Sequence, residues 1–503
     1  MEEKEKLISN TTYAFLNSIA GSILAFIYWI IVSKTLLPED FGIIATSTTL
    51  MSFISMVLPL GVNYAASKLI PEYIEDKKKS KAYSLIRFSF KLILVTNIIS
   101  IAILYTFSQQ ISTSIKITSN AFYLTLLGIL FSSLYVMTSG IYVGLQNFRK
   151  MFTSDVLGNT SKVGASILLI LIGFSFYGPI IGFILSFLIS FFLRIDKNWI
   201  FKKHYVKIDK KQIMLKYSMP ILIFSLATFA FTSMQYIILP LMTDQYETGL
   251  FSTANKVTFF IYIIPSTLGV ALLPVVSGLS AQKFKKQMQS KIIKSSLRYS
   301  LIFTLPIVFF SIIFSNAIIL VFATPKYLDA SPLFTPMALA FLFFGLASIL
   351  INGLYAIRKP EYTRKVSTIT AIIFIFISVL LTYYLKSLGM ALATLTSMFV
   401  IFILSYFHLN RFLKINFHTK ELLKIGIANL YILISFIAIN MFNTILTIKL
   451  TLAILSSVSY LFVYLPLKFY TKNDRDIFLY FSHKLPITRK YINILVKIVE
   501  KYG

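Results

Sequence analysis

The sequence contains no cysteine and few charged residues. The absence of cysteine excludes disulfide frameworks, thiolate metal ligands and cysteine nucleophiles. Only 13% of the 503 residues are charged, whereas 57% are apolar. A water-soluble chain of this length would carry charged residues throughout several domains, but here long apolar runs alternate with short, charge-rich connectors. The composition therefore predicts a protein that is embedded in a membrane.

Several apolar runs are long enough to cross a bilayer as a helix, which takes about 20 residues. The first run is too long for the core of a signal peptide and has no small-residue cleavage pattern after it, so we expect it to be retained. We predict an all-α, multi-pass membrane protein with about fourteen transmembrane helices. The predicted spans are residues 12–33, 42–67, 88–108, 119–146, 152–174, 176–193, 217–241, 248–278, 299–322, 333–357, 366–385, 387–409, 425–446 and 450–467.

Lysine and arginine are distributed unevenly among the connectors between these spans. Cytoplasmic connectors retain these residues, and short outer connectors do not. With both termini placed in the cytoplasm, the outer connectors hold only Lys34, Lys116, Lys326, Lys386 and Lys449. We therefore predict this topology in the cell (plasma) membrane, and we attribute the net charge of +29 to it. Because the positive charge is dispersed over many loops, we expect membrane lipids rather than nucleic acid as partners.

Charged residues within the predicted spans are rare and of one sign. All 19 acidic residues fall in connectors, tails or span ends, and Asp155 is the closest of them to a span interior. Two lysines lie well inside spans, Lys162 and Lys256. Each shares a helix face with polar residues at helical spacing, so these faces are expected to contact protein or water rather than lipid. An ammonium at that depth needs compensation, and an anionic substrate group in a hydrated cavity would supply it.

We therefore predict a substrate-binding site without catalytic residues, metal ligands or a cofactor. Two alternatives stay open: Lys162 can belong to a structural network with Asn159 and Asp155, and the uncharged residues can be helix-packing hydrogen bonds. The four histidines lack ligand spacing. The predicted substrate-binding residues are Lys256, Asn255, Ser252, Lys162, Gln235, Tyr236, Asn63 and Asn17.

Matching features recur about 207 residues apart, which indicates an internal repeat. Gly42 corresponds to Gly249, and Leu60-Gly61-Val62 corresponds to Leu268-Gly269-Val270. We predict two six-helix lobes, residues 1–211 and 212–421, related by a pseudo-twofold axis along the membrane normal. Residues 422–503 would then add two helices and a basic cytoplasmic tail. The prolines of the second, seventh and eighth spans predict kinks: Pro59, Pro220, Pro240, Pro265 and Pro274.

Five segments resemble the polysaccharide-export (Wzx-like) flippases of the multidrug, oligosaccharidyl-lipid and polysaccharide exporter superfamily. They are LMTDQYETGLFSTANKV, IIPSTLGVALLPVVSGL, GVNYAASKLIPEY, SGIYVGLQNFRKM and PKYLDASPLFTPMALAFLFFGL. The resemblance extends through nearly all of residues 5–410. It implies a MATE-like fold and the movement of a polyprenyl-(pyro)phosphate-linked oligosaccharide from the cytoplasmic to the outer leaflet by alternating access. It also implies that Lys256 holds the lipid pyrophosphate, and that glycosyltransferases or a polymerase of the same pathway are partners.

Three other functions were weighed against this one. A MATE-type multidrug or cation antiporter normally needs an intramembrane carboxylate, and this chain has Gln235 where many flippase-family members carry an aspartate. A major-facilitator carrier would show a characteristic acidic and arginine-rich loop, which KLIPEYIEDKKKSKAY lacks. A membrane glycosyltransferase would need a carboxylate cluster beside the membrane and a sizeable soluble portion. The antiporter is therefore the main alternative.

The predicted topology can be tested because the chain has no native cysteine. Single cysteines at Lys78 and Thr243 should be labelled from opposite faces of the membrane by an impermeant maleimide. Labelling of both from outside intact cells would contradict the topology.

Overall fold

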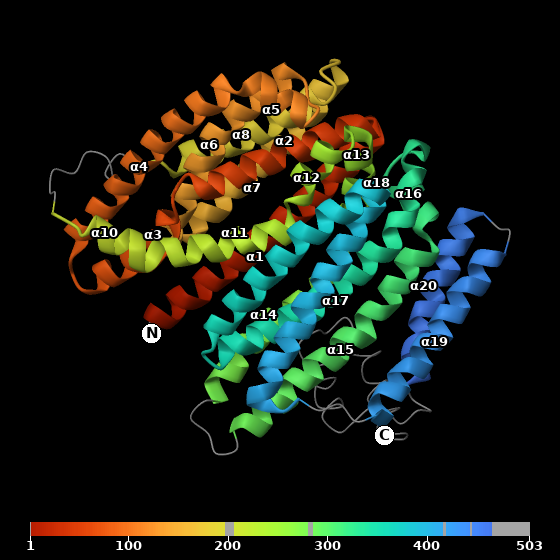
Figure 1. The fold of residues 1–503 in the computed structure, drawn as a ribbon. Helices are drawn as coiled ribbons and strands as arrows, with labels where there is room; N and C mark the ends of the chain where they lie inside the picture. The colour runs from red at the N-terminus through yellow and green to blue at the C-terminus, as the bar shows by residue number, and fades with distance from the viewer. Residues whose placement is uncertain (1, 197–205, 280–284, 416–418, 443–444, 465–503) are drawn as a thin grey trace. The chain divides into compact units, whose positions relative to one another are not determined.

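The computed structural model describes residues 2–196, 206–279, 285–415, 419–442 and 445–464 (Figure 1). Within these ranges the regular structure is helical, without a strand. The predicted basic tail lies outside the described residues. The helices are α1 (Glu2–Thr35), α2 (Pro38–Val57), α3 (Val62–Glu75), α4 (Lys79–Thr106), α5 (Ser108–Ser114), α6 (Ser119–Gly144), α7 (Phe148–Leu171), α8 (Tyr177–Arg194), α10 (Lys210–Gln212), η1 (Ile213–Ser218), α11 (Met219–Thr232), α12 (Gln235–Met242), α13 (Gln245–Thr258), α14 (Phe260–Gly278), α15 (Lys285–Ile313), α16 (Ser315–Phe322), η3 (Pro325–Leu333), α17 (Phe334–Ala356), α18 (Pro360–Leu413), α19 (Thr419–Met441) and α20 (Leu446–Val463).

Each predicted span overlaps a described helix, so the all-α, multi-pass membrane fold is confirmed. In the described part of the chain, eleven helical segments are long and apolar enough to cross a membrane. One of them, the 54-residue α18, contains two predicted spans, and its backbone is non-helical at Lys386, with φ 49° and ψ −128°. The remaining predicted spans correspond to α7 and α20, the latter a shorter apolar helix.

Four predicted spans are each divided into two helices. The breaks lie at Leu58–Gly61, Ser233–Met234, Phe259 and Phe314. Only the first break contains a proline, and there Gly61 adopts a φ of 75°, which glycine tolerates best. The prolines of the seventh and eighth spans instead lie within or at the start of α11, α12 and α14. The breaks in those two spans therefore contain no proline, and the kinks expected at these prolines stay a prediction.

The helices form two compact units, which are described separately. Unit 1 comprises residues 1–257, 319–333 and 367–397, and unit 2 comprises residues 258–318, 334–366 and 398–503. In unit 1, α7 packs against α1 and α8, while α6 packs against α2, α3 and α8. This arrangement brings together polar residues from helices that are distant in sequence. The predicted boundaries of the two lobes stay a prediction.

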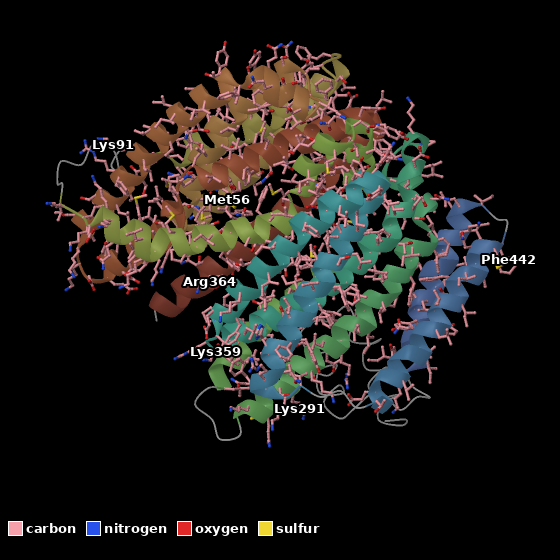
Figure 2. All side chains as sticks on the ribbon, in the orientation of Figure 1. Met56, Lys91, Lys291, Lys359, Arg364 and Phe442 are labelled. Carbon is pink, nitrogen blue, oxygen red and sulfur yellow. The ribbon has the colours of Figure 1, made fainter. Side chains whose placement is uncertain are left out.

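In unit 2, α14 packs against α15 and α17, and α15 packs against α19. Phe314, Ile432, Phe436 and Tyr460 belong to an apolar core that joins α15, α19 and α20. Figure 2 shows Lys291 and Lys359 at one end of this unit and Phe442 at the opposite end. This separation agrees with the cytoplasmic and outer ends predicted from the basic residues.

A reciprocal glycine contact joins α2 to α13 within unit 1. A Cβ atom on Gly42 would lie 2.0 Å from the carbonyl oxygen of Gln245, and one on Gly249 would lie 1.8 Å from that of Pro38. The predicted repeat relates Gly42 to Gly249, and the same offset relates Pro38 to Gln245. The glycine of each repeat therefore lies against the carbonyl group at the equivalent position of the other repeat. Two contacts related in this way are what a twofold axis produces. This contact supports the pseudo-twofold repeat.

We predict that alanine at Gly42 or Gly249 lowers the melting temperature of the purified protein. The added Cβ would meet backbone atoms, and overpacking of this kind typically costs about 1–3 kcal/mol. Gly164→Ala is the matched control, because a Cβ there has no neighbour within 4 Å. That control should be unchanged or more stable, since alanine favours helix by up to ~1 kcal/mol. Equal melting temperatures for all three variants would contradict the close approach.

Candidate functional site: two lysines against an aromatic cluster

Lys162 is buried on α7, with 6% of its surface exposed. Its Nζ donates a hydrogen bond to Asn159 Oδ1 at 3.0 Å, one helical turn away. The same Nζ lies 5.1 Å from the ring centroid of Tyr28 and 4.8 Å from that of Phe183. The hydrogen bond to Asn159 agrees with the alternative in which Lys162 belongs to a structural network, and two aromatic rings also contact the ammonium.

Lys256 is partly buried on α13 and also contacts two aromatic rings. Its Nζ lies 4.6 Å from the ring centroid of Trp29 and 5.4 Å from that of Tyr236. Each such cation–π contact contributes about 0.5–2 kcal/mol, depending on how far the cation is desolvated. Among the described residues, no ion pair includes Lys256 or Lys162.

The aromatic rings connect the two lysines. Tyr28 and Trp29 have centroids 4.9 Å apart, and Phe183 lies 5.3 Å from Tyr28 and 6.3 Å from Trp29. Neighbouring residues of a helix point about 100° apart, so Tyr28 and Trp29 on α1 can face different helices. Tyr28 contacts the lysine of α7 and Trp29 contacts that of α13. We call these three rings, Tyr236 and the two lysines the lysine–aromatic cluster.

Four further predicted residues lie on α12 and α13, two on each helix. Gln235, Tyr236, Ser252 and Asn255 are all buried. Gln235 donates from Nε2 to the carbonyl of Thr232 at 2.8 Å. In the described structure, Gln235 Oε1, Tyr236 OH and Ser252 Oγ are buried without a hydrogen-bond partner. Such atoms are uncommon in folded proteins and are suited to receiving a polar ligand.

The other two predicted residues are placed elsewhere in unit 1. Asn63 is buried on α3, where its backbone is close to Gly140 of α6. Asn17 on α1 donates from Nδ2 to Asp155 Oδ2 at 2.9 Å. The structure therefore places Tyr236 against Lys256 and links Lys162 to them through the shared rings, whereas Asn17 and Asn63 lie elsewhere.

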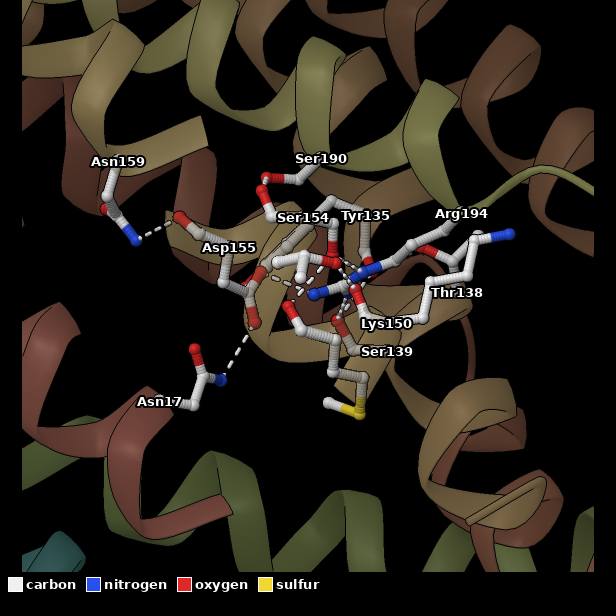
Figure 3. A network of polar contacts seen from close by, with 12 residues as sticks. Asn17, Tyr135, Thr138, Ser139, Lys150, Ser154, Asp155, Asn159, Ser190 and Arg194 are labelled. Atoms are coloured by element: carbon white, nitrogen blue, oxygen red, sulfur yellow. Dashed lines mark hydrogen bonds and ion pairs between the residues drawn. The ribbon is translucent and has the colours of Figure 1, made fainter. Parts of the chain in front are cut away.

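Asp155 belongs to a buried ion-pair network with Arg194, the last residue of α8 (Figure 3). Tyr135 OH donates to Asp155 Oδ1 at 3.1 Å. Arg194 also donates to Ser154 Oγ at 2.8 Å and to Ser139 Oγ at 2.6 Å. The arginine side chain is fully buried and that of the aspartate is 8% exposed. The network thus ties α1, α6, α7 and α8 together.

Sequence analysis missed the role of Arg194 because it follows a predicted span and was counted with the cytoplasmic connector. One signal was available: Ser190 and Arg194 are four residues apart, so they share a helix face. In the structure, Ser190 Oγ donates to the carbonyl of Ser154 at 3.0 Å, next to the arginine contact. No group of three or more metal-ligating side chains is present among the described residues.

The ion pair predicts a non-additive response to mutation. Arg194→Met or Asp155→Leu alone should destabilise the protein by roughly 3–5 kcal/mol, because each leaves the other charge buried and uncompensated. The double variant Arg194→Met/Asp155→Leu should lose much less than the sum, since neither charge remains. Thermal unfolding in detergent measures all three variants. Strictly additive losses would show that the two side chains act independently.

The chain was compared with known proteins. It is 22% identical over 464 residues to the uncharacterized membrane protein MJ1068 of Methanocaldococcus jannaschii, which covers 86% of this chain and 90% of that protein. It is 22% identical over 209 residues to the probable low-salt glycan biosynthesis flippase Agl15 of Haloferax volcanii, covering 42% of this chain and 44% of that protein.

A solved structure described as lipid II flippase MurJ in an inward closed conformation has the same fold. The superposition has a TM-score of 0.72 at 19% sequence identity, and it covers 91% of this chain and 98% of that chain. Residues 31–332 match the family described as "Polysaccharide biosynthesis protein". Because that match spans more than half of the sequence, the chain belongs to the polysaccharide biosynthesis protein family.

Proposed function

We propose that this protein is a flippase that moves a polyprenyl-linked oligosaccharide, joined through phosphate or diphosphate, from the cytoplasmic to the outer leaflet of the plasma membrane. Both termini would be cytoplasmic, and movement would occur by alternating access. The family and the flippases named among its relatives support this function. The observation that carries it is the lysine–aromatic cluster, in which two lysines contact one group of rings and have no carboxylate partner among the described residues.

The charge balance of this cluster favours an anionic ligand. An ammonium near the bilayer centre costs roughly 2.5–3.5 kcal/mol on insertion scales. Cation–π contacts offset only part of that cost for Lys162 and Lys256. A diphosphate offers several charged oxygens, and charge-assisted hydrogen bonds are about twice as strong as neutral ones. The unpartnered polar atoms of Gln235, Tyr236 and Ser252 would add neutral contacts to the same ligand.

Contacts among the predicted outer connectors support alternating access with a closed outer side. Within unit 1, Lys386 Nζ lies 3.5 Å from Glu247 Oε1, and Lys34 Nζ donates to the carbonyl of Leu320 at 2.7 Å. Tyr246 donates to Asp329 at 2.5 Å, and this hydrogen bond is the main reason why the pKa of Tyr246 rises to about 12. The tyrosine therefore remains a donor throughout the physiological pH range. Tyr246 and Glu247 belong to the first turn of α13, just before Gly249 of the glycine crossing.

A multidrug or cation antiporter is the weaker alternative. Such a protein normally binds its cation at an intramembrane carboxylate. Asp155 is already paired with Arg194 and accepts hydrogen bonds from Asn17 and Tyr135. Binding a second cation there would require a buried ion pair to separate, which is costly. Glycosyltransferases or a polymerase of the same pathway are the partners that we propose.

The decisive variants are substitutions of Lys256. Lys256→Gln should reduce flipping in proteoliposomes about ten- to a hundredfold, the effect of losing one charge-assisted hydrogen bond of roughly 1.5–3 kcal/mol. Lys256→Arg should retain part of the activity because the charge survives. Lys91→Gln is the matched control, since Lys91 is an exposed lysine of unit 1 on α4 (Figure 2).

Transport is read from the accessibility of a labelled lipid-linked oligosaccharide at the opposite leaflet, with protein abundance measured in the same vesicles. Full activity of Lys256→Met would remove this lysine from the binding site. A lysine with only a structural role would tolerate methionine, because an apolar residue of similar size fits the same rings.

A further inference from the structure

A recess lies in unit 1, apart from the lysine–aromatic cluster. It forms where the beginning of α1 meets the connector between α6 and α7, and its volume is about 350 Å³. By the distribution of basic residues, this is the cytoplasmic end of the helices. The polar residues that line the recess are Ser9, Asn10, Tyr13, Gln146, Asn147 and Arg149.

The shape of the recess is fixed by local contacts. The ring of Tyr13 packs against that of Phe152 with centroids 5.9 Å apart. Asn147 Oδ1 accepts a hydrogen bond from the backbone N–H of Lys150 at 3.2 Å and caps α7. Gln146 has a φ of 55°, at a position after a helix end where glycine is usual. An L-residue there is strained, so the chain carries an amide side chain in this recess at some cost in stability.

The lining chemistry fits a neutral, hydroxyl-rich ligand. Side-chain amides both donate and accept hydrogen bonds, as sugar hydroxyls do, and the recess contains three of them beside two hydroxyl groups. The aromatic ring of Tyr13 offers an apolar surface for a sugar face. Among the described residues of the lining, Arg149 alone is charged. One arginine among amides is a poorer match for a diphosphate than the two lysines of the other site.

The recess and the lysine–aromatic cluster lie along the same helix seam. Asn10, Tyr13 and Asn17 share one face of α1 at helical spacing, and Asn17 bonds to Asp155 on α7. Farther along the same helix, Tyr28 contacts Lys162. The rise of α1 from Asn10 to Tyr28 is about 27 Å, at roughly 1.5 Å per residue. One sugar attached to a phosphate at the lysines would not span this distance, whereas a chain of several sugars would.

We infer that this recess binds the distal sugars of the lipid-linked oligosaccharide while the phosphate group is held by Lys162 and Lys256. This inference rests on the proposed function, and it adds a site that selects substrates by the length of their glycan. A completed oligosaccharide would occupy both sites, and an unfinished carrier with one sugar would occupy only the lysine site.

The first experiment compares two lipids: a polyprenyl diphosphate that carries one N-acetylhexosamine and one that carries an oligosaccharide long enough to reach the recess. Their binding to the full-length protein in nanodiscs is measured for Asn10→Ala and Gln146→Gly. Each variant should bind the long-glycan lipid about fivefold more weakly, the effect of losing one neutral hydrogen bond. Binding of the single-sugar lipid should not change. Gln146→Gly also relieves the backbone strain, so misfolding is not expected.

Ser18→Ala is the matched control, because Ser18 is exposed on α1 outside the recess. It should bind both lipids as the unmodified protein does. Equal effects of Asn10→Ala and Gln146→Gly on the two lipids, or no effect on either, would overturn the inference while leaving the flippase proposal in place. If the unmodified protein neither binds nor moves either lipid, the proposed function fails and this inference fails with it.

A second experiment uses the absence of cysteine. Ser9→Cys supplies a single thiol at the edge of the recess. The long-glycan lipid should slow its reaction with a maleimide at least severalfold, and the single-sugar lipid should not. Equal labelling rates with and without the long-glycan lipid would show that the glycan does not reach the recess.

Discussion

A charged group that leaves water for the interior of a membrane needs a compensating partner, and unit 1 meets this requirement in two different ways. Arg194 and Asp155 neutralise each other. Arg194 also donates hydrogen bonds to the hydroxyl groups of Ser139 and Ser154, and Asp155 accepts one from Tyr135. Lys162 and Lys256 instead contact aromatic rings, and neither pairs with a carboxylate in the described part of the chain. The first arrangement is internally complete, so it stabilises the packing of four helices. The second leaves two positive charges without an opposite charge among the described residues, which is why we propose it as the binding site for an anion.

The same constraint explains which features could be predicted from the sequence. Apolar runs and the distribution of lysine and arginine are local properties, and they gave spans that each overlap a described helix. Lys162 and Lys256 were recognised because a charge inside an apolar run is anomalous at any depth. Arg194, the partner of Asp155, was not recognised, because it ends its helix and is separated from the aspartate by a whole span. The burial of Arg194 depends on how α7 and α8 pack, and the sequence of either helix alone does not determine that packing.

The aromatic part of the site was equally hidden. Tyr28, Trp29 and Phe183 are ordinary residues of membrane helices, and only their contacts with the two lysines distinguish them. The prolines predicted kinks, yet the helix breaks at Ser233–Met234 and Phe259 contain no proline. A proline removes one hydrogen bond, and neighbouring groups can restore the others within a continuous membrane helix. The interruptions of the seventh and eighth spans therefore depend on tertiary packing as well as on backbone chemistry.

The crossing of α2 and α13 has a consequence for how such a chain can change over generations. In a dimer of two identical subunits, one glycine codon would supply both halves of the contact. Once two copies are fused into one gene, Gly42 and Gly249 are encoded separately, and each still faces the backbone of the other repeat. A substitution at either position disturbs half of a symmetric contact and leaves the other half intact. The fused gene must therefore keep a glycine codon at two separate sites, whereas a gene for the identical subunits of a dimer would need only one. Neither repeat can exchange its glycine for a larger residue without disturbing the contact.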